Sequence, residues 1–246
     1  GQSTGIFVDT IENMKRDAAA AIAYLRARGG IDANRIAILG LSQGGVVGPT
    51  IAADDPRIAA VVMLAGPVGA KHKPFLDGLR AKLSANGTQS QAVDRILVAT
   101  SRFMDSQMAQ APTEAASPAR QALVEAFEAG KFTRDQAEAM AHTLADPMMV
   151  SMYQAGPTEV LGRLRAPTLA LFGGVDSLVS SVDNASAAKA ALRRNADARV
   201  IVVPRMEHSF QKAESDATGR LTYSGPAVSD PVVLDIIGGW LKNHLR

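Results

Sequence analysis

The apolar positions between Thr10 and Arg28 recur at three- and four-residue steps, which is the period of an amphipathic helix. Thr10 can cap the first turn, and Gly29 and Gly30 follow the last one. This segment is therefore predicted to be a helix with both ends marked.

Four short apolar runs further along the chain are too brief for helices and predict buried strands. They are IAILG, IAAVVMLAG, PTLALFGG and ARVIVVP, at residues 36–40, 58–66, 167–174 and 198–204. Helical patterns occupy residues 183–194 and the segment from Asp230 onward, where Pro231 suits a first turn. Buried strands alternating with helices predict an α/β fold with a mostly parallel sheet.

The segment between the second and third strands has no strand pattern, and helical patterns occupy its residues 75–83, 91–108, 118–129 and 133–144. We therefore expect a catalytic core at residues 1–67 and 166–246 and an inserted helical cap at residues 68–165, over the edge of the sheet where ligands of open α/β folds bind. Six of the nine methionines lie in this segment. They can form an apolar wall for an acyl group, or, as for Met104 and Met108 four residues apart, pack the core of the cap itself.

Composition narrows the range of functions. The 246 residues are 47% hydrophobic and 20% charged, which suits one catalytic domain with an insertion. The net charge is only +2 and the basic residues are scattered, so nucleic acid is not an expected partner.

The lack of cysteine removes disulfides and thiolate metal sites. No run approaches the roughly 18 apolar residues of a membrane span, so a membrane is not an expected partner either. Neither a metal nor a cofactor is implied, and the compartment stays open between the cytoplasm and the periplasm or exterior.

The serine-hydrolase signature G-x-S-x-G occurs twice, as GQSTG at residues 1–5 and as GLSQG at residues 40–44. A nucleophile elbow needs a strand that enters a sharp turn and then a helix. Ser42 has the strand IAIL before it, glycines around it and an apolar helical stretch after it, whereas Ser3 has no strand before it. Ser42 is therefore the predicted nucleophile.

A serine nucleophile needs a base, and the base needs a carboxylate that fixes its tautomer. His208 lies just past the last predicted strand, and Asp176 lies just past the strand before it, so both follow the serine in the order acid, histidine. Asp183 is the fallback acid, but it stands where a helix start would place a capping residue. The remaining histidines fit worse, by chain order or by position in helical segments: His72, His142 and His244.

At these positions the chain resembles the α/β-hydrolase superfamily, and within it the bacterial serine esterases related to the serine aminopeptidase and dienelactone-hydrolase-like groups. The resemblance rests on GLSQGG, LAGP, APTLALFGGVDSLVS and the stretch from HSFQ to GGWL, and it covers nearly the whole chain. Two residues depart from the pattern: Leu41 replaces a histidine before the nucleophile, and Glu207 stands where an asparagine often precedes the catalytic histidine. Glu207 either forms hydrogen bonds within its loop or raises the basicity of His208.

The resemblance also gives GQSTG a position. In these esterases a similar segment follows the fourth strand and precedes the helix that leads to the elbow, so this chain is expected to start partway into the fold, without the first strands. One of the two oxyanion-hole amides would be absent with them, leaving the Gln43 N–H. The chain is then either a fragment of a longer enzyme or a protein that completes itself by pairing, with a second copy or with an N-terminal segment.

The function implied is serine-dependent hydrolysis of small carboxylic esters with short to medium acyl chains, through an acyl-enzyme intermediate. Ser42 attacks, His208 transfers the proton, Asp176 orients His208 and the Gln43 amide helps to hold the oxyanion. Thioesters and peptides are alternative substrates, while a haloalkane dehalogenase would need a carboxylate nucleophile. The alternative from another class is a non-catalytic, hydrolase-like binding module that lacks a complete oxyanion hole.

Overall fold

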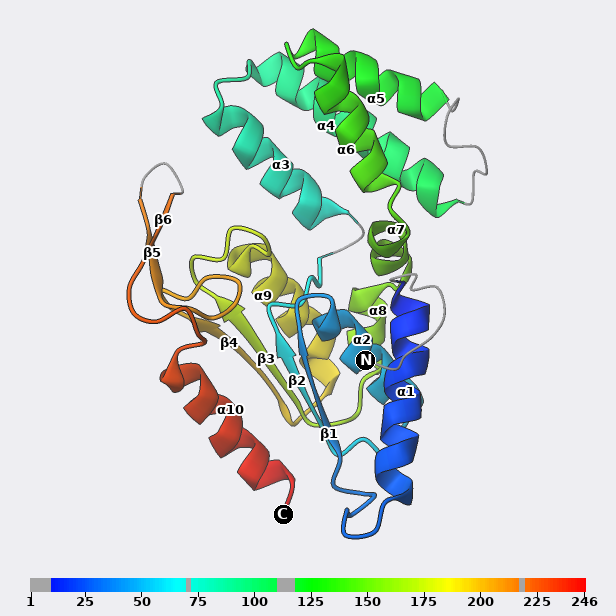
Figure 1. Ribbon diagram of the computed structural model, residues 1–246, viewed down its shortest axis with the longest axis vertical. Helices are drawn as coiled ribbons and strands as arrows, with labels where there is room; N and C mark the ends of the chain where they lie inside the picture. The colour runs from blue at the N-terminus through cyan, green and yellow to red at the C-terminus, as the bar shows by residue number, and fades with distance from the viewer. Residues whose placement is uncertain (1–9, 70–71, 110–117, 217–219) are drawn as a thin grey trace. The chain divides into compact units, whose positions relative to one another are not determined.

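The computed structural model describes residues 10–69, 72–109, 118–216 and 220–246 (Figure 1). The motif GQSTG and Ser3 lie outside these residues. The chain forms two compact units, one comprising residues 10–14 with Leu79–Gln154 and the other comprising Lys15–Gly78 with Ala155–Arg246. The second unit contains the sheet, and the first is helical. The functional division at residues 68 and 165 stays a prediction.

The sheet has four parallel strands in the order in which they occur along the chain, within the part of the chain that the structure describes. They are β1 (Ala37–Leu41), β2 (Ala60–Leu64), β3 (Thr168–Gly173) and β4 (Ala198–Val203). The central strands β2 and β3 are buried along their whole length, as expected for strands covered on both faces. The predicted α/β fold with a parallel sheet is confirmed, including all four predicted strands.

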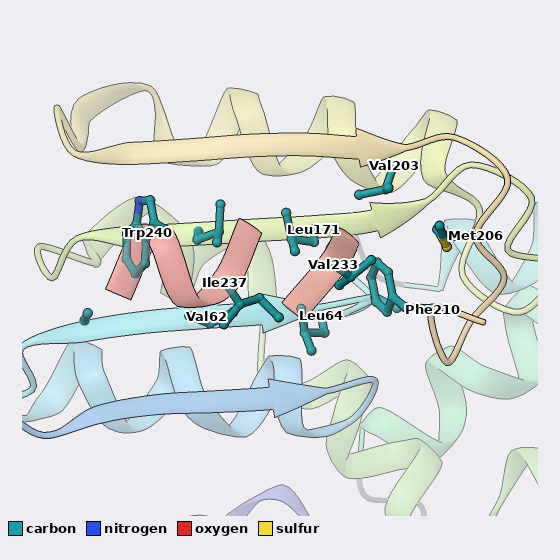
Figure 2. Close-up of a cluster of buried hydrophobic side chains, with 12 residues drawn as sticks. Val62, Leu64, Leu171, Val203, Met206, Phe210, Val233, Ile237 and Trp240 are labelled. Atoms are coloured by element: carbon teal, nitrogen blue, oxygen red, sulfur yellow. The ribbon is translucent and has the colours of Figure 1, made fainter. Parts of the chain in front are cut away.

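Helices cover both faces of this sheet. The helix α2 (Gly44–Asp54) packs on β1 and β2, α9 (Ser181–Ala191) packs on β3 and β4, and α8 (Pro157–Arg163) lies against α2 and α9. A short 3₁₀ helix, Leu192–Arg194, continues α9. The helix α10 (Pro231–His244) crosses the opposite face, in front of β2 and β3 in Figure 2, with α2 and α9 behind the sheet.

The contact between α10 and the sheet forms an apolar cluster (Figure 2). Val233, Ile237 and Trp240 follow one another at helical spacing and point toward the strands, so one stripe of α10 is buried. Leu171 on β3 is 0% exposed beneath them. Burial of each such side chain contributes about 1.5–3 kcal/mol, which holds α10 on the sheet and, with it, the loop that precedes the helix.

The predicted starts of the first and last helices are present in the structure. In α1 (Ile11–Ala27) the Thr10 hydroxyl accepts a hydrogen bond from the Asn13 N–H at 3.2 Å. In α10 the Asp230 carboxylate accepts one from the Val232 N–H at 2.9 Å, and Pro231 occupies the first turn. These bonds satisfy backbone donors that a helix start leaves without intrahelical acceptors.

The helical unit is built from α4 (Ser90–Met108), α5 (Pro118–Ala129), α6 (Arg134–Leu144) and α7 (Pro147–Gln154), with most of α3 (Lys73–Ala85). Helix α4 packs against α5 and α7, and α6 packs against α5. Met104 is 2% exposed, as a core methionine would be. The sequence patterns did not indicate α7 or α8. No helix in the described ranges is both long enough and apolar enough to cross a membrane.

Candidate active site

The carboxyl ends of the parallel strands lie at one edge of the sheet, and the three predicted catalytic residues follow three of these ends. Ser42 comes directly after β1, Asp176 follows β3 and His208 follows β4. The parallel register therefore brings them to the same edge although they are far apart in sequence. All three belong to the sheet-containing unit.

Ser42 occupies a strained turn between β1 and α2. Its φ of 55° lies in the left-handed region, which a non-glycine residue rarely adopts and which costs about 1–3 kcal/mol. Two hydrogen bonds hold the turn: the Ser42 N–H donates to the Leu64 carbonyl at 2.8 Å, and the Gly45 N–H donates to the Ser42 carbonyl at 2.8 Å. A Cβ at Gly40 would lie 2.0 Å from the Gly44 oxygen, so only glycine fits there. A strand, a sharp turn and a helix in this order form the backbone that a nucleophile elbow requires.

Asp176 and His208 are joined directly. His208 Nδ1 lies 2.9 Å from Asp176 Oδ2, and because a carboxylate can only accept, Nδ1 carries a proton in this contact and Nε2 faces away from it. The other carboxylate oxygen accepts the N–H groups of Leu178 and Val179, each at 2.8 Å. The Asp176 side chain is 0% exposed and that of His208 is 15% exposed. The acid is thus fixed by its own loop, while the imidazole reaches the surface of the site.

The fallback acid has a local role. Asp183 lies in the first turn of α9, where its Oδ2 accepts a hydrogen bond from the Ser180 hydroxyl at 3.4 Å. Negative charge is favourable at that end of a helix, so the helix start accounts for this aspartate. The structure pairs His208 with Asp176 instead.

The environment of His208 favours its protonated form. The hydrogen bond that His208 donates to Asp176 is the main cause that raises the pKa of His208, burial opposes it, and the negative charges of Asp176 and Glu207 add to the rise. Within the described ranges no hydrogen bond joins Ser42 to His208. Such contacts are often long in unliganded hydrolases and shorten when substrate binds.

Glu207 forms hydrogen bonds inside the loop that carries His208. Its Oε1 accepts the N–H groups of Ser209 at 2.7 Å and Gln211 at 3.0 Å, and the residue is 8% exposed. Its charge also contributes to the raised pKa of His208. The two interpretations of this residue from the sequence are therefore compatible rather than exclusive.

Residues with positive φ gather at this edge of the sheet. Besides Ser42, they are Ala65 after β2, with φ 46°, and Arg205 and Phe210 on the two sides of His208, with φ 57° and 62°. Strained backbone of this kind clusters at functional sites, where the surrounding structure compensates for its cost. The sequence did not indicate the last three, because none of them is glycine.

The loop after β2 is held by a residue that the sequence pattern did not single out. Asn184, on α9, is 0% exposed, and its side-chain oxygen accepts the N–H groups of Val68 at 2.7 Å and Gly69 at 3.2 Å. Thr158 on α8 donates to the Val68 carbonyl at 2.6 Å. Two helices therefore fix the loop that leaves β2 beside the elbow.

A short hairpin follows the loop of His208, and His244 packs at the end of α10. After the loop, β5 (Ala213–Ser215) and β6 (Leu221–Tyr223) form an antiparallel hairpin, which the sequence pattern did not indicate. His244 Nδ1 lies 2.7 Å from the Trp240 carbonyl, and its ring stacks on Trp240, as expected at a helix end. No cluster of three potential metal ligands occurs among the residues described.

The sequence was compared with family models and with curated proteins. The model of a family described as serine aminopeptidase, S33, matches residues 1–216. The chain belongs to this family. It is therefore an α/β-hydrolase, as the elbow, the sheet and the order of the three residues also indicate. The comparison with curated proteins finds no match.

Solved structures of α/β-hydrolases share the fold of this hydrolase. An esterase from Pyrococcus furiosus is 14% identical, with a TM-score of 0.54 over 100% of this chain and 67% of the other. E-2-(acetamidomethylene)succinate hydrolase is 20% identical, with a TM-score of 0.52 over 98% of this chain and 78% of the other. A thermophilic esterase from Thermogutta terrifontis, with malate bound, is 19% identical, with a TM-score of 0.50 over 100% of this chain and 77% of the other. Identities this low bear on the fold alone.

Proposed function

We propose that this α/β-hydrolase cleaves carboxylic esters with short to medium acyl chains, with Ser42 as nucleophile, His208 as base and Asp176 as orienting acid. The observation that carries the proposal is the hydrogen bond of 2.9 Å between Asp176 and His208, at the sheet edge where the strained turn presents Ser42. A buried carboxylate that holds one imidazole nitrogen leaves the other free to take a proton from a serine.

The reaction proceeds in two halves. In the first, His208 Nε2 takes the hydroxyl proton as Ser42 Oγ attacks the acyl carbon, and then returns it to the departing alcohol as the C–O bond breaks. In the second, His208 takes a proton from water, the resulting hydroxide attacks the acyl-enzyme, and Ser42 Oγ is released with its proton restored. Asp176 stabilises the imidazolium that forms in each half.

The oxyanion of each tetrahedral intermediate forms close to the start of α2. Gln43 is the N-cap residue of this helix and follows Ser42 directly, so its backbone N–H is the proposed donor to the oxyanion. The partial positive charge of a helix N-terminus adds to the stabilisation. A single donor of this kind typically contributes a factor of about 100 to 1,000 in rate.

Peptides are the second candidate substrates, because the matching family is described as serine aminopeptidase. The same three residues can cleave either bond, since both reactions pass through an acyl-enzyme and a tetrahedral oxyanion. The esterases among the solved structures favour the ester, but only by likeness of fold.

Turnover of p-nitrophenyl acetate and butyrate, beside aminoacyl p-nitroanilides, tests the proposal. We expect ester hydrolysis that Ser42→Ala abolishes and Ser215→Ala, a substitution at an exposed position on β5, leaves unchanged. Ester turnover that survives Ser42→Ala would refute the assignment, and preference for the anilides would favour the peptidase. Turnover of neither substrate class would favour the non-catalytic binding module.

A further inference from the structure

Glu207 closes the loop that carries His208. Glu207 accepts three hydrogen bonds within this loop. Its Oε1 accepts the N–H groups of Ser209 at 2.7 Å and Gln211 at 3.0 Å, and its backbone carbonyl accepts the Phe210 N–H at 3.0 Å. A fourth runs from the Glu207 N–H to the Gln211 carbonyl, at 3.0 Å. Glu207 and Gln211, the two ends of the pentapeptide 207–211, are thus hydrogen-bonded to each other. His208 is the second residue of this pentapeptide.

The tie holds backbone that is otherwise unfavourable. Phe210 has a φ of 62°, which a residue with a bulky side chain rarely adopts, and the residue is only 1% exposed. Glu207 Oε1 accepts hydrogen bonds from the N–H groups of the two residues that flank Phe210, and these bonds offset the backbone strain. The acceptor is the carboxylate of a residue that is only 8% exposed, and charged acceptors bind backbone donors more tightly than neutral ones.

We propose that Glu207 is a positioning residue of this hydrolase, whose carboxylate fixes the loop that presents His208 and supplies a second negative charge, beside Asp176, to the imidazole. This inference rests on the proposed function, in which His208 is the base. The carboxylate therefore acts through His208 and touches no reacting atom.

Charged residues in and beside the loop bear on the titration of His208. Asp176 and Glu207 are the two whose charges raise the pKa of His208. Arg205 precedes the loop and Lys212 follows it. Asp230, whose N–H donates to the Phe210 carbonyl at 2.8 Å, uses its carboxylate to cap α10. Removing the charge of Glu207 should therefore lower the pKa of His208 while Asp176 still holds the ring.

Two substitutions separate the charge from the hydrogen bonds. Glu207→Gln keeps an oxygen that can accept both N–H groups but removes the charge, whereas Glu207→Ala removes both. Glu214→Gln, at an exposed position on the neighbouring β5, removes the same charge from a carboxylate that is not part of the loop. Each variant is compared by the pH profile of kcat/KM for p-nitrophenyl butyrate and by the NMR titration of the four histidine rings, with His208 assigned from the spectrum of His208→Ala.

In Glu207→Gln we expect the acid limb of the kcat/KM profile and the His208 titration to move to lower pH, with little change of kcat at high pH. In Glu207→Ala we expect kcat to fall about tenfold to a hundredfold with KM nearly unchanged, since a displaced base costs rate. A Glu207→Gln profile that coincides with that of Glu214→Gln would overturn the inference, even where Glu207→Ala does not fold.

The NMR titration keeps the two proposals distinguishable. Absence of ester turnover in the unsubstituted protein, together with a lowered His208 titration in Glu207→Gln, would remove the proposed function and leave the effect of Glu207 on His208 in place. An unmoved titration in an active enzyme would remove the role of Glu207 alone.

Discussion

Replacing Asp176 by asparagine should nearly abolish turnover without unfolding the protein. The carboxylate accepts three hydrogen bonds, one from His208 at 2.9 Å and two from the backbone of residues 178 and 179 at 2.8 Å each. An asparagine has one oxygen and one NH₂ group, so it must choose which partners the oxygen serves. If the asparagine oxygen points to the backbone, both backbone hydrogen bonds are kept. If it points to His208, the two backbone N–H groups face the NH₂ group and lose their acceptor, which costs about 1–3 kcal/mol for each N–H.

The first orientation is therefore favoured, and it places the asparagine NH₂ against His208 Nδ1. That nitrogen must then accept, the proton moves to Nε2, and the imidazole can no longer take the proton of Ser42. A triad with the wrong tautomer loses about 10⁴ in kcat, which corresponds to about 5.5 kcal/mol in the barrier. Because the two backbone bonds survive, the melting temperature should change little.

Initial rates with p-nitrophenyl butyrate measure this loss, and a thermal melt checks the fold. Asp183→Asn is the matched control, because Asp183 was the alternative acid and is assigned here to the start of α9. We expect Asp183→Asn to keep nearly all activity. Retention of more than about a tenth of the wild-type kcat by folded Asp176→Asn would refute the tautomer argument. A tenfold loss of kcat raises the barrier by only about 1.4 kcal/mol, far less than the expected increase of about 5.5 kcal/mol.

Three further outcomes follow from the geometry. Because the pKa of His208 is raised, kcat/KM should rise with pH through a midpoint above 6.5, the pKa of a free imidazole. The stability that protonated His208 adds to the fold should be complete below pH 6.5 and be lost as pH rises through the raised pKa. An activity midpoint below 6.5 would contradict this. Gly40→Ala should lower activity and reduce the free energy of unfolding by about 1–3 kcal/mol or more. Gly239→Ala should instead stabilise α10 by about 0.5–1 kcal/mol, because a Cβ at Gly239 would have no atom within 4 Å. Urea unfolding measures both changes. Asn184→Ala should destabilise by about 2–4 kcal/mol because it leaves two backbone N–H groups without acceptors, and a loss under about 0.5 kcal/mol would show that water replaces the amide.

Much of the sheet could be predicted because its elements carry strong periodic signals. The four apolar runs became four parallel strands, and the capped segment after Thr10 became α1. The parallel arrangement then places the residues that follow each strand at one edge. The hydrogen bond between Asp176 and His208 is consistent with a prediction drawn from chain order and from their positions just past two strands.

The missed elements have weak signals for physical reasons. Strands β5 and β6 are three residues each, too short for an alternating pattern, and they are stabilised by pairing with each other. Helix α7 has only eight residues and most of them are apolar, so no contrast between an apolar and a polar face marks it in the sequence. Helix α8 has only seven residues, with two of them buried, which is less than two full turns of pattern.

The supporting residues of the site were the hardest to foresee. Asn184 looks like a surface residue in a polar helical stretch, yet its partners lie more than a hundred positions earlier in the chain and its side chain is fully buried. The bonds of Glu207 depend on a turn whose positive φ falls on Phe210, where no glycine signals it. Such contacts follow from tertiary structure and have no periodic signature.

The most direct test of the account is covalent labelling by a fluorophosphonate, read by intact mass. The probe reacts with a serine that an adjacent base activates, so it reports the nucleophile without any choice of substrate. We predict that the protein gains one adduct, that the adduct maps to Ser42, and that Ser42→Ala gains none. An adduct that forms equally on Ser42→Ala would contradict the central claim that Ser42 is the reactive serine of this hydrolase.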